Sequence, residues 1–153
     1  MREIYIKGEN MKIKQLSIFL ENKEGSLYDA LETLTEGGIN IRALSLADTS
    51  DFGILRVVVD NPSKGIEILE KNHFLVKPVD IIAIEMNDSP GGLSSILGII
   101  KKNNIDLEYL YAFTHEKANK AILLLHTDNL DNLITTLKNE NVVIVPPEEV
   151  YNL

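Results

Sequence analysis

The sequence predicts an α+β protein built from two tandem copies of one β-α-β-β-α-β unit. The first observation is an internal repeat at an offset of 66 positions, which brings apolar positions and a glycine into register. The matched pairs include Leu16 with Ile82, Ile18 with Ile84, Gly25 with Gly91, and Leu31 with Leu97. The second observation is that each copy alternates between segments of period two, typical of strands, and segments of helical period.

The first copy begins with a strand and a helix. Residues 12–20 carry apolar side chains mostly at every second position, which predicts a half-buried strand. A polar turn over residues 21–25 follows. Residues 26–36 place apolar side chains at i, i+3, i+4 and i+7, which is one face of a helix. We expect Ser26 to be its N-cap and the glycine pair at 37–38 to end it.

The remaining elements complete the unit. In the first copy we expect strands at 40–47 and 53–60, a helix at 61–72 with Pro62 in its first turn, and a strand at 74–79. In the second copy we expect a strand at 80–86, a turn at 87–92, a helix at 93–103, strands at 105–113 and 120–126, a helix at 130–139 and a strand at 142–145.

This order predicts two ferredoxin-like sandwiches, each an antiparallel four-stranded sheet with two helices on one face. The expected domains are residues 12–80 and 81–153. Residues 1–11 are expected to form either an N-terminal leader or a short extra strand.

The composition excludes several classes of function. The net charge of −8 opposes binding to nucleic acid, and no run of 18 apolar residues is present to span a membrane. Without cysteine, the chain has no disulfide, thiolate metal site or cysteine nucleophile. The histidines, His73, His115 and His126, lack metal-ligand spacing to one another. We therefore expect a cytoplasmic protein with no metal and no cofactor.

Two turns carry a common motif, an asparagine or aspartate, two residues, a glycine, one residue and a leucine. It reads Asn22-x-x-Gly25-x-Leu27 in the first copy and Asp88-x-x-Gly91-x-Leu93 in the second. This motif resembles the strand-to-helix signature of ACT domains. Residues 38–41, Gly-Ile-Asn-Ile, are similar to the entry of the family's second strand, and Asp106 holds the asparagine position in the second copy. The resemblance covers roughly residues 12–150.

The resemblance implies that the chain binds a free amino acid at the junction of two ACT domains. Carried over, it implies a first site with Asn22, Gly25 and Asn40 and a second with Asp88, Gly91 and Asp106, together with neighbouring backbone at Ser26, Leu27, Gly92 and Leu93. Backbone N–H groups at the helix start suit the ligand's carboxylate, and asparagine oxygens suit its ammonium. Two aspartates would oppose that carboxylate, so we expect the first site to be the working one.

Two alternatives remain beside this reading. Acylphosphatases share the small fold but need an arginine in the first strand-to-helix loop, and neither loop here has one. No other catalytic set stands out, so we expect no enzyme and no catalytic residues. The stronger rival is a regulatory subunit that docks onto an enzyme of amino-acid metabolism, because residues 20–27 resemble the opening segment of such subunits. A homodimer is expected in either case.

Overall fold

The computed structural model describes residues 11–48, 51–114 and 119–153. The chain divides into two compact units. The first unit is residues 14–79 with residues 150–153, and the second unit is residues 80–149 with, among the described residues, 11–13. Within the described residues, no helix is long and apolar enough to cross a membrane.

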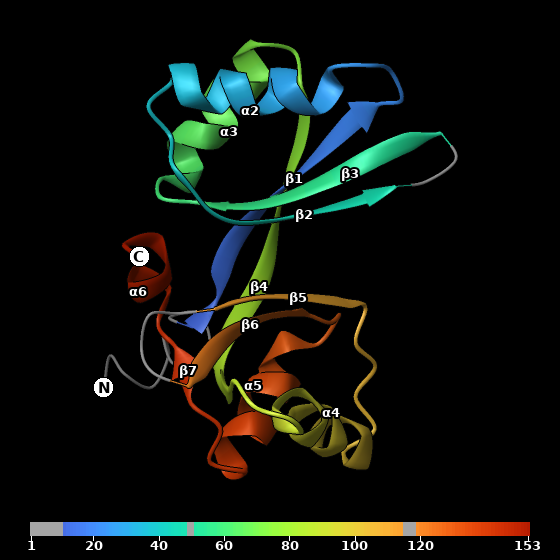
Figure 1. Cartoon of the computed structure of the whole chain (residues 1–153), viewed down its shortest axis with the longest axis vertical. Coiled ribbons are helices and arrows are strands. Elements are labelled where there is room, and N and C mark those ends of the chain that lie inside the picture. Colours follow the sequence, from blue (N-terminus) through green and yellow to red (C-terminus); the bar gives the residue numbers. More distant parts are fainter. Residues whose placement is uncertain (1–10, 49–50, 115–118) are drawn as a thin grey trace. The chain divides into compact units, whose positions relative to one another are not determined.

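The first unit has the predicted β-α-β-β-α-β order (Figure 1). Its elements are β1 (Ile13–Glu21), α2 (Ser26–Glu36), β2 (Ile41–Asp48), β3 (Phe52–Val59), α3 (Pro62–Lys71) and the first part of β4 (Leu75–Asn87). The strand order is β2-β3-β1-β4. Helices α2 and α3 pack beside each other on one face of this sheet.

The register of β3 fixes both ends of this sheet. Glu21, the last residue of β1, pairs with Phe52 at the start of β3, and Ile41, the first residue of β2, pairs with Val59 at its end. The turn after β1 and the entry to β2 therefore lie at opposite ends of the sheet.

Burial of apolar side chains holds the helices to the sheet. Alternate residues of β1 face the helices, as the period of two predicted, and each fully buried aliphatic side chain contributes about 1.5–3 kcal/mol. The buried cluster is Leu16, Ile18, Leu20, Ala30, Leu34, Ile39, Leu55, Val57, Val59, Leu69 and Val76.

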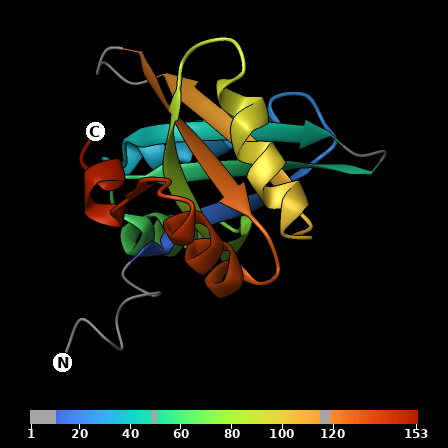
Figure 2. The same cartoon turned by 90° about the horizontal axis from the view of Figure 1, so that it is seen from below.

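The second unit repeats the arrangement. It contains the second part of β4, then α4 (Gly92–Lys102), β5 (Tyr109–Thr114), β6 (Lys120–His126), α5 (Leu130–Asn139) and β7 (Ile144–Val145). Strand β4 pairs with β6 and β7, and β6 pairs with β5, all antiparallel. Helices α4 and α5 lie over this sheet (Figure 2). The predicted α+β fold of the two copies is confirmed.

Several elements differ from the sequence prediction, among them the strand expected at 105–113, which begins only at Tyr109. The separate strands expected at 74–79 and 80–86 are one continuous strand, β4, because no residue between them turns the chain. After Pro146 a short helix, α6 (Pro147–Tyr151), follows β7, and it has no counterpart among the elements expected from the sequence. Residues 150–153 group with the first unit. The domain limits 12–80 and 81–153 stay a prediction, and so does the role of residues 1–11, of which 1–10 lie outside the described part.

Candidate functional site

The turn between β1 and α2 is held by its own backbone. The N–H of Lys23 donates to the carbonyl of Glu21 (2.8 Å), and the N–H of Ser26 donates to the carbonyl of Lys23 (3.3 Å). Gly25 then adopts φ 86°, a left-handed conformation that glycine reaches without penalty. A tight turn at this point delivers Ser26 as the first residue of the helix.

Ser26 is not the N-cap that the sequence predicted. Gly25 occupies that position, and no side chain caps α2, because the serine already has helical geometry and its side chain turns inward. Ser26 is 8% exposed, and its Oγ has no hydrogen-bond partner among the described residues. A buried hydroxyl without a partner costs free energy, so this atom is suited to a ligand.

The Ser26 side chain borders a pocket of about 480 Å³, here called the Ser26 pocket. Its walls are Phe19, Leu20, Glu21, Asn22, Lys23, Ser26, Asp29, Asp51, Phe52, His73, Phe74 and Leu75. An adjoining cavity of about 290 Å³ shares Ser26 and Asn22 and adds Leu27 from the helix and part of β2. All of these residues belong to the first unit.

The Ser26 pocket is lined by aromatic side chains and by charged ones. The Phe19 and Phe52 rings lie 5.9 Å apart, and Phe74 adds a third aromatic wall. The charged walls are the carboxylates of Glu21, Asp29 and Asp51 together with Lys23 and His73, and Lys23 Nζ lies 3.5 Å from Glu21 Oε2. A pocket of this kind can hold a small ligand that carries a cationic group beside an apolar body.

Asn40 lies away from this pocket. Its N–H donates to Oδ1 of Asp60 (3.1 Å), and its carbonyl accepts from the Asp60 N–H (3.0 Å). The partners of Glu21 and Ile41 on β3 are seven positions apart, which places Asn22 and Asn40 roughly 23 Å apart along the sheet. One unit does not bring the two asparagines of the expected first site together.

The equivalent turn in the second unit has similar backbone but different side chains. Gly91 adopts φ 89° and is the N-cap of α4, and Gly92 occupies the position of Ser26. Gly91 and Gly92 border a pocket of about 350 Å³, together with Glu85 and Lys120. Lys120 Nζ donates to Asn87 Oδ1 (2.8 Å). This pocket has no counterpart of the buried serine hydroxyl among the described residues.

The other residues of the expected second site do not line that pocket. Asp88 and Asp106 are both exposed, and Leu93 is partly so. The N–H of Asp88 donates to the carbonyl of Asn119, and the carbonyl of Asp106 accepts from Thr127 Oγ1. These two partners mark opposite ends of β6, so the two aspartates do not meet within the unit.

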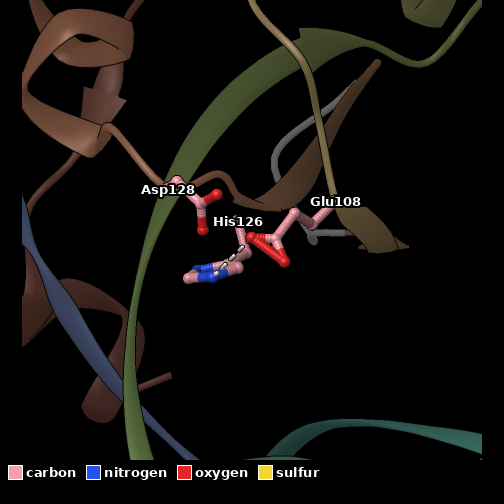
Figure 3. Close-up of side chains that lie close together, drawn as sticks. All are labelled: Glu108, His126 and Asp128. Carbon is pink, nitrogen blue, oxygen red and sulfur yellow. Dashed lines mark ion pairs between the residues drawn. The ribbon is translucent and has the colours of Figure 1, made fainter.

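A further cluster of polar groups escaped the sequence analysis. Glu108, His126 and Asp128 come together where β5 begins and β6 ends (Figure 3). A hydrogen bond with the Asp128 carboxyl raises the pKa of Glu108 above its ordinary value. The spacing of the histidines along the sequence does not reveal the carboxylates that a hairpin brings beside His126. The pairing of Tyr109 with His126 was the missing signal, and His115 lies outside the described residues.

Comparison with known proteins settles the family. The family model described as ACT domain pair matches residues 11–153. The chain belongs to the ACT domain pair family. The prediction from the two turn motifs is thereby confirmed.

Individual relatives agree with this assignment. The chain is 25% identical to the acetolactate synthase small subunit of Buchnera aphidicola subsp. Baizongia pistaciae over 134 residues, which is 86% of this chain and 83% of that protein. The crystal structure of protein BT0572 from Bacteroides thetaiotaomicron is 38% identical, has a TM-score of 0.87 and is matched over 94% of this chain and 98% of that one.

A more distant structure shares the fold alone. The ligand-free regulatory subunit of aspartate kinase from Thermus thermophilus is 10% identical, with a TM-score of 0.59, and the match covers 84% of this chain and 92% of that subunit.

Proposed function

We propose that this ACT domain pair is a regulatory protein that binds a free amino acid in the Ser26 pocket. The observation that carries the proposal is that Ser26 lines the pocket and that its buried hydroxyl has no partner among the described residues. A folded chain tolerates such an atom when a ligand supplies the missing hydrogen bond.

The ligand's carboxylate would lie at the start of α2. There the Ser26 hydroxyl can donate, and the N–H groups of Leu27 and Tyr28 have no acceptor within the helix. The partial positive charge of the helix N-terminus favours an anion at this place. Gly25 contributes by adopting the left-handed conformation that begins the helix at Ser26 without a side-chain cap.

The ligand's ammonium would lie beside the carboxylates that line the pocket. Glu21, Asp29 and Asp51 supply negative charge, and Asn22 supplies an amide oxygen. An apolar part of the ligand would rest against Phe19 and the other aromatic walls. The ammonium role that the sequence analysis shared between Asn22 and Asn40 passes to these groups, since Asn40 reaches the ligand only if another copy of the unit supplies it.

The proposal is tested by melting the protein with each of the twenty amino acids at millimolar concentration. A ligand at a hundred times its dissociation constant adds about 2.7 kcal/mol and raises the Tm by several degrees. At least one amino acid should do so. Unchanged melting curves across the whole panel would reject amino-acid binding.

Variants then localise the ligand. Ser26→Ala should cut the ligand-induced rise in Tm to about half or less, because loss of the hydroxyl donor weakens binding at least about tenfold. Ser63→Ala is the matched control, since Ser63 is an exposed serine on α3 of the same unit. An equal loss in both variants would separate the ligand from the Ser26 pocket.

A second candidate function is a regulatory subunit that docks onto a separate enzyme. The observation that favours it is the similarity to the acetolactate synthase small subunit. Affinity purification at native concentration should then recover a catalytic subunit of amino-acid metabolism, with recovery that depends on the ligand found in the melting panel. The expected homodimer is measured by sedimentation of the purified chain alone.

A further inference from the structure

Three metal-ligating side chains converge in the second unit, far along the chain from the Ser26 pocket. One ligand atom each from Glu108, His126 and Asp128 lies within 4.8 Å of the others. Glu108 immediately precedes β5, His126 is the last residue of β6, and Asp128 follows in the connection to α5. The N–H of Glu108 donates to the carbonyl of His126 (3.0 Å), so the hairpin register itself sets the cluster.

Contacts from outside the cluster orient the imidazole. His126 Nδ1 lies 2.8 Å from the backbone carbonyl of Asp80, and a carbonyl only accepts, so Nδ1 carries a proton. The Tyr109 ring stacks on the imidazole at 5.0 Å. In the neutral ring Nε2 therefore carries the lone pair, and it lies 3.6 Å from Glu108 Oε2 (Figure 3).

This arrangement is the one that metal-bound histidines adopt. A ligating histidine almost always donates its other ring N–H to a carbonyl or carboxylate, which fixes the tautomer. Here that second hydrogen bond is already formed by Asp80, and three electron-pair donors face one another. One cation between them can accept an electron pair from all three groups, whereas protons bridge them only in pairs, His126 with Glu108 and Glu108 with Asp128.

We propose that Glu108, His126 and Asp128 bind one divalent transition-metal ion of the Zn²⁺ type. Tetrahedral zinc with bonds of about 2 Å keeps its ligand atoms about 3.3 Å apart, close to the 3.6 Å between His126 Nε2 and Glu108 Oε2. Both carboxylates are exposed and can rotate inward, and solvent can supply the fourth ligand. The imidazole favours zinc, nickel or copper over magnesium or calcium.

The bound ion would join two places of the second unit. Glu108 lies at the start of β5, and Asp128 lies one residue before Asn129, the N-cap of α5. A metal bridge would therefore tie the hairpin to the start of this helix. The site is independent of amino-acid binding in the first unit, so either can fail without the other.

The test is calorimetric titration of zinc chloride into the full chain, freed of tags and stripped with a chelator, at neutral pH. One ion per chain should bind. Glu108→Gln and Asp128→Asn, which keep the side-chain shapes, should each weaken binding at least tenfold. Asp106→Asn is the matched control, because it removes the same charge from a nearby exposed aspartate outside the cluster.

A nuclear magnetic resonance measurement identifies the ligand atom. Zinc should shift the ¹⁵N resonance of His126 Nε2 and leave Nδ1 protonated. Absence of zinc binding, an unmoved His126 resonance, or a Glu108→Gln/Asp128→Asn double variant that binds zinc as the wild type does would overturn the proposal. An equal loss in Asp106→Asn would overturn it too, since the effect would then be general charge.

Discussion

At the scale of single residues, the two copies differ at the equivalent positions 26 and 92. They are equivalent in the repeat, but one is a buried serine and the other a glycine. A β-carbon at Gly92 would lie 2.0 Å from the backbone oxygen of Asn87, so the second unit has no room for a serine there. The hydroxyl donor is therefore a property of the first unit, and this asymmetry favours one working site.

The neighbouring glycines are constrained for a different reason. Gly25 and Gly91 have positive φ, but a β-carbon at either would meet nothing within 4 Å. Gly25→Ala should therefore cost only the left-handed conformation, about 1–2 kcal/mol. A β-carbon at Gly25 would therefore crowd nothing within the turn itself.

Gly92→Ala should be more damaging than Gly25→Ala. Its β-carbon meets backbone, which cannot rotate away as a side chain can, so the loss should reach about 3 kcal/mol. Urea unfolding of the two variants measures the difference in free energy of unfolding. Equal losses would show that the turn before α4 yields easily.

At the scale of elements, the four longer helices begin in two ways. Helices α3 and α5 have asparagine N-caps: Asn61 accepts from the N–H of Lys64 (3.2 Å), and Asn129 accepts from that of Asn132 (3.1 Å). Helices α2 and α4 begin with a left-handed glycine and have no side-chain cap. Of these four described helices, only α2 and α4 line the Ser26 pocket and the pocket at Gly91 and Gly92. Their first N–H groups therefore remain available to a ligand.

Removal of a cap should destabilise the fold without touching the ligand. Asn61→Ala should lower the free energy of unfolding by about 1 kcal/mol, whereas Asn61→Ser should retain most of it, because serine also caps. Thermal melting without ligand measures both. If serine is as harmful as alanine, the Asn61 hydrogen bond is not what stabilises α3.

The elements themselves were largely predictable from the sequence. The period of two in β1 and the helical spacing in α2 depend on local burial, which the residue pattern records. The sequence pattern predicts two extended segments, at 74–79 and 80–86, but does not show that they form the single strand β4. Only strand pairing decides whether a strand continues. Pro78 lies within that strand without ending it.

The candidate site was less predictable than the fold. The motif located the turn, Gly25 and Ser26, but not the pocket, whose walls include Phe52, Phe74 and other residues distant in sequence. The register of β3 also separates Asn22 from Asn40, which no local pattern reveals. Sites built across strands need pairing information that a single sequence does not carry.

At the scale of the whole molecule, the C-terminal residues return to the first unit. Arg42 donates from Nε to the carbonyl of Tyr151 (2.8 Å) and from Nη1 to that of Leu153. The N–H of Lys14 donates to the Tyr151 hydroxyl (2.9 Å), and Val150 is fully buried. The first unit is thus completed by residues from the C-terminal end of the described chain.

Loss of the Val150 side chain should weaken this attachment. Val150→Ala should lower the free energy of unfolding by about 2 kcal/mol, from lost burial and the remaining cavity. Leu153→Ala is the control, because Leu153 is 41% exposed and should change stability by less than about 0.5 kcal/mol. Urea unfolding followed by circular dichroism compares them, and equal effects would mean that the tail adds no stability through Val150.

The central claim is that a bound amino acid supplies the missing hydrogen-bond partner of the buried Ser26 hydroxyl. Titration calorimetry with Ser26→Ala tests this claim most directly. With the amino acid found in the melting panel, the wild type should bind one molecule per chain. Ser26→Ala should bind at least about tenfold more weakly, and yet be about 1 kcal/mol more stable without ligand, because it removes an unsatisfied buried group. Two molecules per chain, or wild-type affinity in a folded Ser26→Ala, would contradict the account.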